Sequence, residues 1–246
     1  MNPNIIVVGG SFAGLTAAYE LKRLLKNKVD VTVIARQEQF IFIPSFIWIV
    51  PGWRRPDQLT FDLKPALESK NIRFIKAVLL EIKPEQNSIV TNVGNFEYDY
   101  LVIATGPHFD WNEVPGMGPD KKEEREGGER DGFTQSICSL PHAIEARNAW
   151  KEFIKDPGPV VLGSTQYASC FGAEYEIAFN IDRALRQAKI RDKVPVTFIT
   201  AEPFLGHFGI GGMGKGQQMV EWFFKKLKIE WITNASIKNV VPNEIN

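Results

Sequence analysis

The stretch Asn4-Ile5-Ile6-Val7-Val8-Gly9-Gly10-Ser11-Phe12-Ala13-Gly14 indicates the fold class. It opens with a short apolar run that stops at two glycines, as a buried parallel strand does where it enters a tight turn. Apolar residues then recur three or four apart, which predicts a helix: Leu15, Ala18, Leu21, Leu24 and Leu25. A second apolar run covers residues 29–34. Strand, glycine-rich turn, helix and strand within about 30 residues predict one unit of a doubly wound α/β sheet.

The same order returns in the second half of the chain. A helix is predicted at 141–154, with Ser139 as its cap, and a Pro/Gly segment follows it. A strand at 159–162, a helix at 173–188 and a strand at 194–200 then repeat the pattern, and a helix at 217–226 leads into a strand at 230–233. We predict an α/β protein with tandem Rossmann-like dinucleotide-binding folds of the FAD/NAD(P)-binding type. The expected parts are an FAD-binding domain at 1–118, a charged loop and connecting helix at 119–156, and a second, incomplete domain at 157–246.

Charge and cysteine content exclude several classes of protein. The chain has 29 basic and 29 acidic residues among 246, so its formal charge is zero. This balance argues against nucleic-acid binding, which normally shows as a basic patch. Two cysteines without paired C-x-x-C spacing predict neither a disulfide scaffold nor a metal site. We expect no signal peptide and no membrane span, because the longest apolar stretch, at 40–51, is shorter than the roughly 20 residues that a span needs.

The glycine-rich turn is a candidate phosphate-binding loop. Small residues there let backbone N–H groups approach a pyrophosphate, which then lies at the positive end of the helix. Ser11 replaces the usual second glycine and is small enough to allow this approach. The acidic residue expected for a ribose after the second strand is missing, because Ala35 and Arg36 stand there. A plain tight turn is the alternative.

A second motif, Ala104-Thr105-Gly106, ends a predicted strand at 100–104. Other elements are predicted at 63–70 (helix), 73–80 and 88–91 (strands). With the first loop, this motif resembles the two-dinucleotide-binding-domain flavoproteins, which carry such a turn beside FAD. The resemblance implies FAD as the cofactor and a set of residues that bind it: Gly9, Gly10, Ser11, Ala13, Gly14, Ala35, Arg36, Ser45, Val78, Ala104, Thr105 and Gly106.

Four more motifs narrow the resemblance to the sulfide:quinone oxidoreductases of bacteria and archaea: Phe42-Ile43-Pro44-Ser45, Gln135-Ser136-Ile137-Cys138, Ala168-Ser169-Cys170-Phe171-Gly172 and Gly206-His207-Phe208-Gly209-Ile210. The similarity covers essentially the whole chain. In that family, cysteine sulfurs beside the flavin take up sulfide as persulfide or polysulfide, and electrons pass to FAD and then to a membrane quinone. The resemblance implies that Cys170 handles sulfur and that Cys138 assists its transfer or release. It also implies proton-carrying roles for Glu176, His142 and His207.

The placement of the cysteines agrees with this chemistry. Cys138 precedes the cap of one predicted helix, and Cys170 lies at the start of another. A helix N-terminus stabilises thiolate and lowers the pKa of a thiol below its free value of about 8.5. Such thiols exchange sulfur more readily near neutral pH. Two buried structural cysteines are the alternative. A solvated carboxylate is the alternative for Glu176, and a structural hydrogen bond is the alternative for His142 and His207.

The second turn, at 163–172, lacks the glycines of an NADH-binding loop. Thr165, Gln166 and Tyr167 place side chains where the pyrophosphate would lie. Glu202 follows the next strand, where an acid for the ribose belongs, but the loop before it is wrong. We therefore expect a nicotinamide site that has been lost. Residues 40–43, Trp48 and Trp53 are expected to form one aromatic cluster around the cofactor or, alternatively, along a quinone path.

The sequence predicts an FAD-dependent enzyme that oxidises sulfide and reduces quinone. We expect it at the cytoplasmic side of a membrane, attached peripherally through a C-terminal part that this chain lacks, and homo-oligomers are compatible with it. The alternatives are the flavoprotein subunit of a flavocytochrome sulfide dehydrogenase, an NADH:quinone oxidoreductase-like flavoprotein, and a flavin-binding redox module or inactive fragment. The third cysteine of the family is missing, so the chain is expected to be truncated or completed by another polypeptide.

Overall fold

The computed structural model describes residues 2–111, 113–118 and 132–246, so the expected charged loop at 119–131 lies outside the described residues. The chain folds as two compact units. The first comprises Met1–Phe42 and Asp57–Phe109, and the second comprises Ile43–Pro56 and Asp110–Asn246. This division differs from the expected one, because the segment 43–56 and the connecting helix both belong to the second unit.

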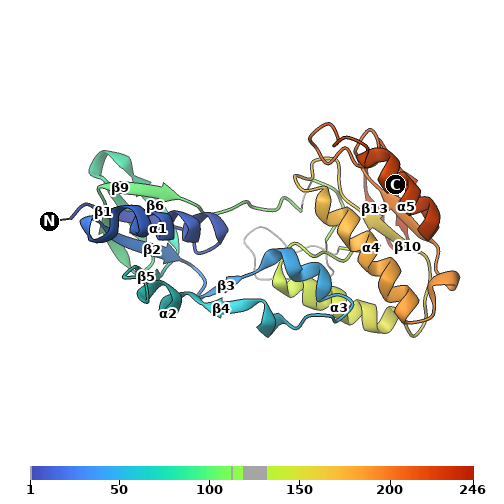
Figure 1. Ribbon diagram of the computed structural model, residues 1–246, viewed down its shortest axis with the longest axis horizontal. Helices are drawn as coiled ribbons and strands as arrows, with labels where there is room; N and C mark the ends of the chain where they lie inside the picture. The colour runs from blue at the N-terminus through green and yellow to red at the C-terminus, as the bar shows by residue number, and fades with distance from the viewer. Residues whose placement is uncertain (1, 112, 119–131) are drawn as a thin grey trace. The chain divides into compact units, whose positions relative to one another are not determined.

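A parallel sheet forms the centre of the first unit, in the order β5-β2-β1-β9. Its strands are β1 (Asn4–Val8), β2 (Asp30–Ala35), β5 (Arg73–Lys76) and β9 (Tyr100–Ile103). Helix α1 (Phe12–Leu25) connects β1 to β2 and packs on this sheet (Figure 1). Val7 and Val33 are paired in register and fully buried, so the apolar runs of the sequence become the core of the unit.

Smaller elements complete the first unit. Helix α2 (Leu63–Glu68) precedes β5, and β3 (Gln39–Ile41) pairs with β4 (Thr60–Asp62). Strands β6 (Leu79–Lys83), β7 (Ser88–Thr91) and β8 (Gly94–Glu97) form an antiparallel meander. The prediction of one strand at 73–80 is therefore wrong. The chain leaves the parallel sheet at Ala77, whose N–H donates to Ala35, and Val78 turns it into the meander by pairing with Asn92.

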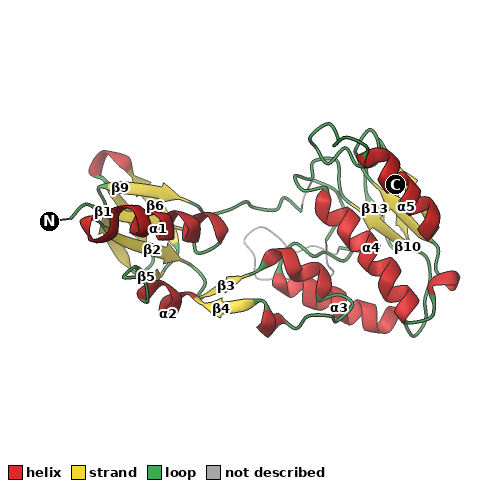
Figure 2. Ribbon diagram, in the orientation of Figure 1, coloured by secondary structure: helices red, strands yellow, loops and turns green. Residues whose placement is uncertain are grey.

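The second unit repeats the architecture with a three-stranded parallel sheet, β10-β11-β12 (Figure 2). The strands are β10 (Val160–Gly163), β11 (Val196–Ile199) and β12 (Ile229–Ile232). Helices α4 (Gly172–Gln187) and α5 (Gly216–Leu227) connect them, and α3 (Leu140–Phe153) precedes them. Strands β13 (Val240–Val241) and β14 (Glu244–Ile245) form a hairpin. The tandem Rossmann-like fold predicted from the sequence is confirmed.

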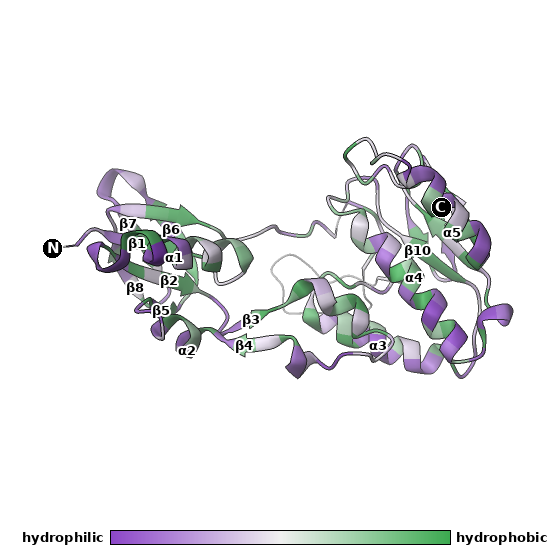
Figure 3. Cartoon of the chain, viewed as in Figure 1, coloured by the Kyte–Doolittle hydropathy of each residue, from purple (hydrophilic) through white to green (hydrophobic). Residues whose placement is uncertain are grey.

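The core of the second unit lies between this sheet and its helices. Helix α4 alternates apolar and polar residues along its length (Figure 3), and Ala178, Ile181 and Leu185 form its buried face. Phe198 of β11 and Phe224 of α5 are fully buried against that face, with ring centroids 5.2 Å apart. Short 3₁₀ helices link the larger elements: η1 (Lys26–Lys28), η2 (Ile43–Trp48), η3 (Pro56–Gln58), η4 (Pro84–Gln86) and η5 (Arg191–Lys193).

The residues of the expected aromatic cluster are divided between the two units. Phe40 stacks on Phe61 in the first unit, with ring centroids 4.8 Å apart. Trp53 lies in the second unit, where its Nε1–H donates to Gln187 over 3.1 Å and its ring lies under Arg183. Among the helices of the described residues, none combines the length and apolarity needed to cross a bilayer.

Candidate active site

The glycine-rich loop after β1 has no room for larger side chains. A Cβ on Gly9 would lie 2.0 Å from the carbonyl oxygen of Ala104, and one on Gly14 would lie 1.9 Å from the carbonyl oxygen of Gly9. Gly9 also has a φ of +130°, which disfavours any other residue. A Cβ on Gly10 would lie 2.7 Å from Leu63 Cδ1 and 2.9 Å from Ala35 Cβ. The loop is thus a backbone cradle of the kind that a dinucleotide pyrophosphate needs.

The start of α1 is suited to phosphate. Ser11 is the N-cap, yet its side chain makes no capping hydrogen bond, and the first turn, which contains Ala13, holds no acidic residue. The first backbone N–H groups of the helix are therefore without a competing side-chain anion. An anion at this end is stabilised by these N–H groups and by the helix dipole.

Other residues predicted to bind the cofactor meet at the same edge of the sheet. Ala35 ends β2, Arg36 follows it at the surface, and the Ala104-Thr105-Gly106 turn follows β9. These strands are parallel neighbours of β1, so their carboxyl ends lie together. Val78 follows β5 nearby, but both of its backbone polar groups bond to Asn92, which leaves only its half-exposed side chain for a ligand.

Ser45 does not belong to this edge. It lies in η2, within the second unit, and its side chain is 6% exposed. The motif around it resembles a cofactor contact in sequence, and its role remains a prediction.

Cys170 lies at the carboxyl edge of the second sheet. It follows the turn after β10 and precedes α4, whose N-cap is Phe171. The thiol is free and exposed. A buried structural role, the alternative for this cysteine, is therefore wrong. Cys138 is also free and exposed, just before Ser139 caps α3 by accepting the N–H of His142 over 3.3 Å.

The turn that carries His207 lies beside the Cys170 segment. A Cβ on Gly209 would lie 3.4 Å from the ring of Phe171, so the two segments are close neighbours. The rings of Phe171 and Phe208 pack against the same core cluster. His207 is half-buried, and its ring meets Phe204 edge-on at 5.2 Å. The structure thus brings together the segments of two residues predicted from separate motifs.

The other histidine of the predicted site is enclosed. His142 is 3% exposed, in the first turn of α3, with its ring edge-on to Trp111 at a centroid distance of 5.2 Å. Its surroundings are those of a packed side chain.

Two glutamates of α4 have opposite environments. Glu176 is exposed, as its alternative interpretation as a solvated carboxylate also requires. Glu174 is 4% exposed, and burial raises its pKa to about 7. The hydrogen bond from the Thr200 hydroxyl opposes the rise, and the neighbouring Glu202 carboxyl adds to it. We did not predict Glu174 as a site residue, although helical spacing places it on the apolar face with Ala178.

Two residues that bear on the predicted loss of a nicotinamide site, Gln166 and Glu202, have partners within the protein. Gln166 makes two hydrogen bonds of 3.1 Å with the backbone of Ile237. Glu202 is 2% exposed and turned inward, where it accepts hydrogen bonds from the Tyr175 hydroxyl and the Phe208 N–H. A carboxylate committed to these donors is not available to a ribose. In the described part of the chain, no three His, Cys, Asp or Glu side chains are grouped as a metal site would require.

Comparison with known proteins assigns the chain to a family. The family model of the pyridine nucleotide-disulphide oxidoreductases matches residues 3–245. The chain belongs to this family. Members combine the two dinucleotide-binding folds that the structure shows, so the fold and the family agree.

Several relatives within the pyridine nucleotide-disulphide oxidoreductases act on sulfide by name. Sulfide-quinone reductase of Aquifex aeolicus (strain VF5) is 38% identical over 246 residues, which is 100% of this chain and 54% of the relative. Mitochondrial sulfide:quinone oxidoreductase of Dictyostelium discoideum is 31% identical over 202 residues, 80% of this chain and 42% of the relative. The resemblance predicted from the motifs is confirmed.

Solved structures agree. The X-ray structure of the Aquifex aeolicus sulfide:quinone oxidoreductase matches with a TM-score of 0.89 at 37% identity, over 99% of this chain and 53% of that one. NDH2 of Plasmodium falciparum in complex with NADH matches with a TM-score of 0.71 at 18% identity, over 100% of this chain and 50% of that one, which shows the shared fold alone. The chain spans about half the length of the relatives it matches.

Proposed function

We propose that this protein is an FAD-dependent sulfide:quinone oxidoreductase, which oxidises sulfide to persulfide, polysulfide or sulfur and passes the electrons to a membrane quinone. The observation that carries the proposal is the free, exposed Cys170 thiol, which lies beside the His207 turn at the carboxyl edge of the second sheet. The named activity of the relatives supports it.

FAD accepts two electrons from the sulfur substrate when it is bound. The chain's own contribution to holding it is the cradle of Gly9, Gly10 and Gly14 with the uncapped start of α1. Backbone N–H groups there bind the pyrophosphate, and the glycines allow its close approach.

Cys170 provides the atom that receives sulfur. Conversion of its thiolate and HS⁻ into a persulfide forms one S–S bond and releases one proton and two electrons, which bound FAD would accept and quinone would finally receive. A thiolate is the nucleophile in sulfur exchange, so exposure of Cys170 to the incoming sulfide is essential. Cys138, the second exposed thiol, accepts sulfur from Cys170 for growth of the polysulfide or for its release.

Released protons need carriers. Glu176 is solvent-exposed on α4, six residues after Cys170, and passes protons to water. His207 is half-buried on the neighbouring turn and suits transfer near neutral pH. His142 is the weaker carrier, because its ring is enclosed.

An NADH-dependent activity is disfavoured by two features of the second unit. Gln166, in the turn after β10, is hydrogen-bonded to the backbone of Ile237. The Glu202 carboxylate is buried and accepts the Phe208 N–H, so it is not free to bind a ribose. Peripheral attachment to the cytoplasmic side of a membrane, and assembly into a homo-oligomer, belong to the same proposal as the quinone reaction.

The test is anaerobic flavin spectroscopy on the FAD-reconstituted protein. Sulfide should bleach the visible flavin absorbance, and a short-chain quinone should restore it, whereas NADH should leave it unchanged. Cys170→Ser should bind FAD normally but resist bleaching by sulfide. Cys138→Ser, the matched thiol variant, should still bleach in a single turnover. A yellow protein that sulfide cannot reduce would contradict the proposal.

A further inference from the structure

Both neighbours of His207 in the chain are tied to the same buried pair. The Gly206 N–H donates to the Tyr175 hydroxyl over 2.8 Å, and the Phe208 N–H donates to the Glu202 carboxylate. The Tyr175 hydroxyl in turn donates to the other oxygen of Glu202. The backbone on each side of His207 is therefore connected to the Glu202 carboxylate, through Tyr175 on one side and directly on the other.

The turn is held in a conformation that it would not readily keep by itself. Phe208 has a φ of +55°, which is uncommon for a residue other than glycine and persists where surrounding structure fixes it. The ring of Phe208 packs edge-on against the ring of Tyr175, with centroids 5.1 Å apart. The N–H group and the ring of Phe208 thus both hold the turn against the buried pair of Tyr175 and Glu202.

A second carboxyl group shares this site. The Thr200 hydroxyl donates to Glu174 over 3.0 Å and lies 3.2 Å from Glu202. One hydroxyl proton cannot satisfy two buried carboxylates fully. Because both carboxyls lie within hydrogen-bond distance of the same hydroxyl, a negative charge on one disfavours a negative charge on the other. Glu174 is the member whose charged form is disfavoured, first by burial and then by the neighbouring Glu202.

The groups around the pair come from four segments. Helix α4 supplies Glu174 and Tyr175, the turn after β10 supplies Ser164, and β11 and its end supply Thr200 and Glu202. The turn at 204–212 supplies the N–H groups of Gly206 and Phe208. Among the described residues, the groups that shift the pKa of Glu174 include no lysine or arginine, so none of them offsets its negative charge.

We propose that Glu202 and Tyr175 are positioning residues, which fix the turn at 204–212 that carries His207, and that the protonation of Glu174 beside Glu202 makes this tether depend on pH. The pKa of Glu174, raised to about 7 mainly by burial, places the change near neutrality. Below that pH, Glu174 is neutral and Glu202 accepts from both donors. Above it, two buried carboxylates repel and the turn loosens. The inference rests on the proposed role of His207 for its functional meaning, while the tether itself is measurable without that role.

The experiment is amide hydrogen exchange of residues 204–212 at pH 6 and pH 8, corrected for the intrinsic pH dependence of exchange, on the full chain. Wild type should exchange several-fold faster at pH 8. Tyr175→Phe keeps the ring but removes the hydroxyl relay, and should raise exchange at both pH values about tenfold. Glu202→Gln should do the same, because the amide can accept at only one of the two oxygen positions. Glu230→Gln, an exposed carboxylate on β12, should match wild type.

Variants of Glu174 distinguish a pH-dependent tether from ordinary packing of the turn. Glu174→Gln should abolish the difference between pH 6 and pH 8, and Glu174→Asp should retain it. The Phe208 amide proton should give a matching NMR signature, a downfield resonance that titrates in wild type and not in Glu174→Gln. Tryptophan fluorescence identifies variants that fail to fold. Unchanged exchange in folded Tyr175→Phe would overturn the proposal. If the tether is found but His207→Gln retains full sulfide-dependent flavin reduction, the proton role of His207 fails and the positioning role stands.

Discussion

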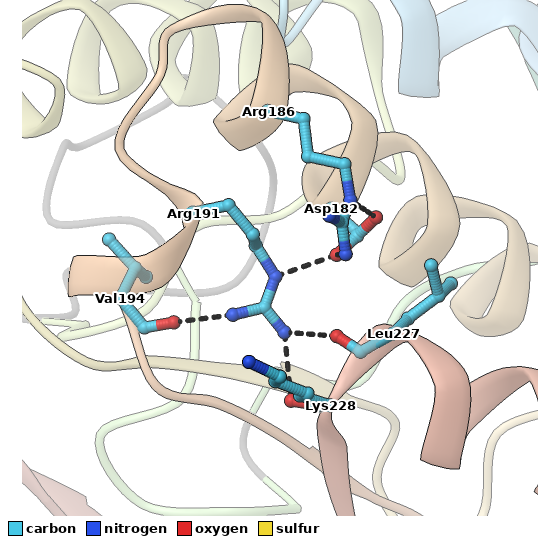
Figure 4. A network of polar contacts seen from close by, with 6 residues as sticks. All are labelled: Asp182, Arg186, Arg191, Val194, Leu227 and Lys228. Carbon is cyan, nitrogen blue, oxygen red and sulfur yellow. Dashed lines mark hydrogen bonds and ion pairs between the residues drawn. The ribbon is translucent and has the colours of Figure 1, made fainter.

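Replacement of Arg191 should destabilise the second unit more than any surface change. The side chain is 8% exposed, and its guanidinium joins three segments of the unit (Figure 4). It donates to Asp182 of α4 over 2.6 Å, to the Val194 carbonyl over 2.8 Å, and to the carbonyls of Leu227 and Lys228 over 2.6 and 2.8 Å. The last two are carbonyls at the end of α5, which a helix leaves without internal partners.

The cost of losing these bonds follows from their burial. Arg191→Met keeps most of the side-chain volume but leaves Asp182 with Arg186 alone, on the half-exposed side of the helix. Removing one partner of a buried ion pair costs about 3–5 kcal/mol. Hydrogen bonds to charged groups contribute about 1.5–3 kcal/mol each, but four bonds from one guanidinium are not additive. We therefore expect the free energy of unfolding to fall by about 3–5 kcal/mol.

Tryptophan fluorescence isolates the affected unit, because all six tryptophans of the sequence lie in it. In urea, with a slope of about 2 kcal/mol per M, the midpoint should fall by about 1.5–2.5 M. Arg191→Lys should fall between wild type and Arg191→Met, because an ammonium lacks the planar fork that reaches all four acceptors. Arg23→Met, which breaks an exposed ion pair with Glu20 in the first unit, should leave the midpoint unmoved. A loss below about 1 kcal/mol for Arg191→Met would refute the assignment of this network as a clamp.

Three more variants probe the loop, the buried acid and the packing. Gly14→Ala should weaken FAD binding at least tenfold in fluorescence titration, since its Cβ would collide with a backbone carbonyl, whereas Gly158→Ala has open space and should bind normally. The unfolding free energy of the second unit should fall as pH rises from about 4.5 to about 7, because the folded pKa of Glu174 lies above the unfolded one. The shift corresponds to at most about 3 kcal/mol, of which we expect about half after solvent relaxation, and a Glu174→Gln urea series that still shows the decline would exclude this source. Gly52→Ala should cost about 1–3 kcal/mol, because the new Cβ would lie 1.8 Å from Arg147 Nη1, and Arg147→Ala in the same chain should relieve part of that loss.

Most elements of the fold could be predicted because their signals are local. The β1 run, the glycines after it and the spacing of α1 lie within 22 consecutive residues, Asn4–Leu25, and each acts on its own neighbours. The cap of α3 is the predicted one, and the starts of α3 and α4 lie within a residue of the predicted starts. The predicted element boundaries are wrong where a residue distant in the sequence determines them. Ala77 ends a strand because it meets Ala35, which the run 73–80 cannot reveal.

Some residues of the candidate site could likewise be predicted from local signals, and others could not. Cys138, Cys170 and His207 follow turns and helix starts that the sequence marks, so their places could be anticipated. Glu174 and Glu176 are two residues apart and chemically identical, but successive helix positions turn by about 100°, so one faces the core and the other the solvent. Which face is inside depends on the sheet beneath α4, and that is decided only by the packed fold.

Glu202 shows the same limit most clearly. By position along the chain it is the acid after β11, the place of a ribose ligand in a dinucleotide fold. The sequence by itself determined that an acid stands there and that the loop before it is unsuited to NADH. Only the tertiary structure turned that carboxylate inward, because Tyr175 and the Phe208 N–H, 27 and 6 residues away, meet it in the core. Long-range hydrogen bonds of this kind have no periodic or local trace in a sequence, and they are what distinguishes the site of this protein from the general fold.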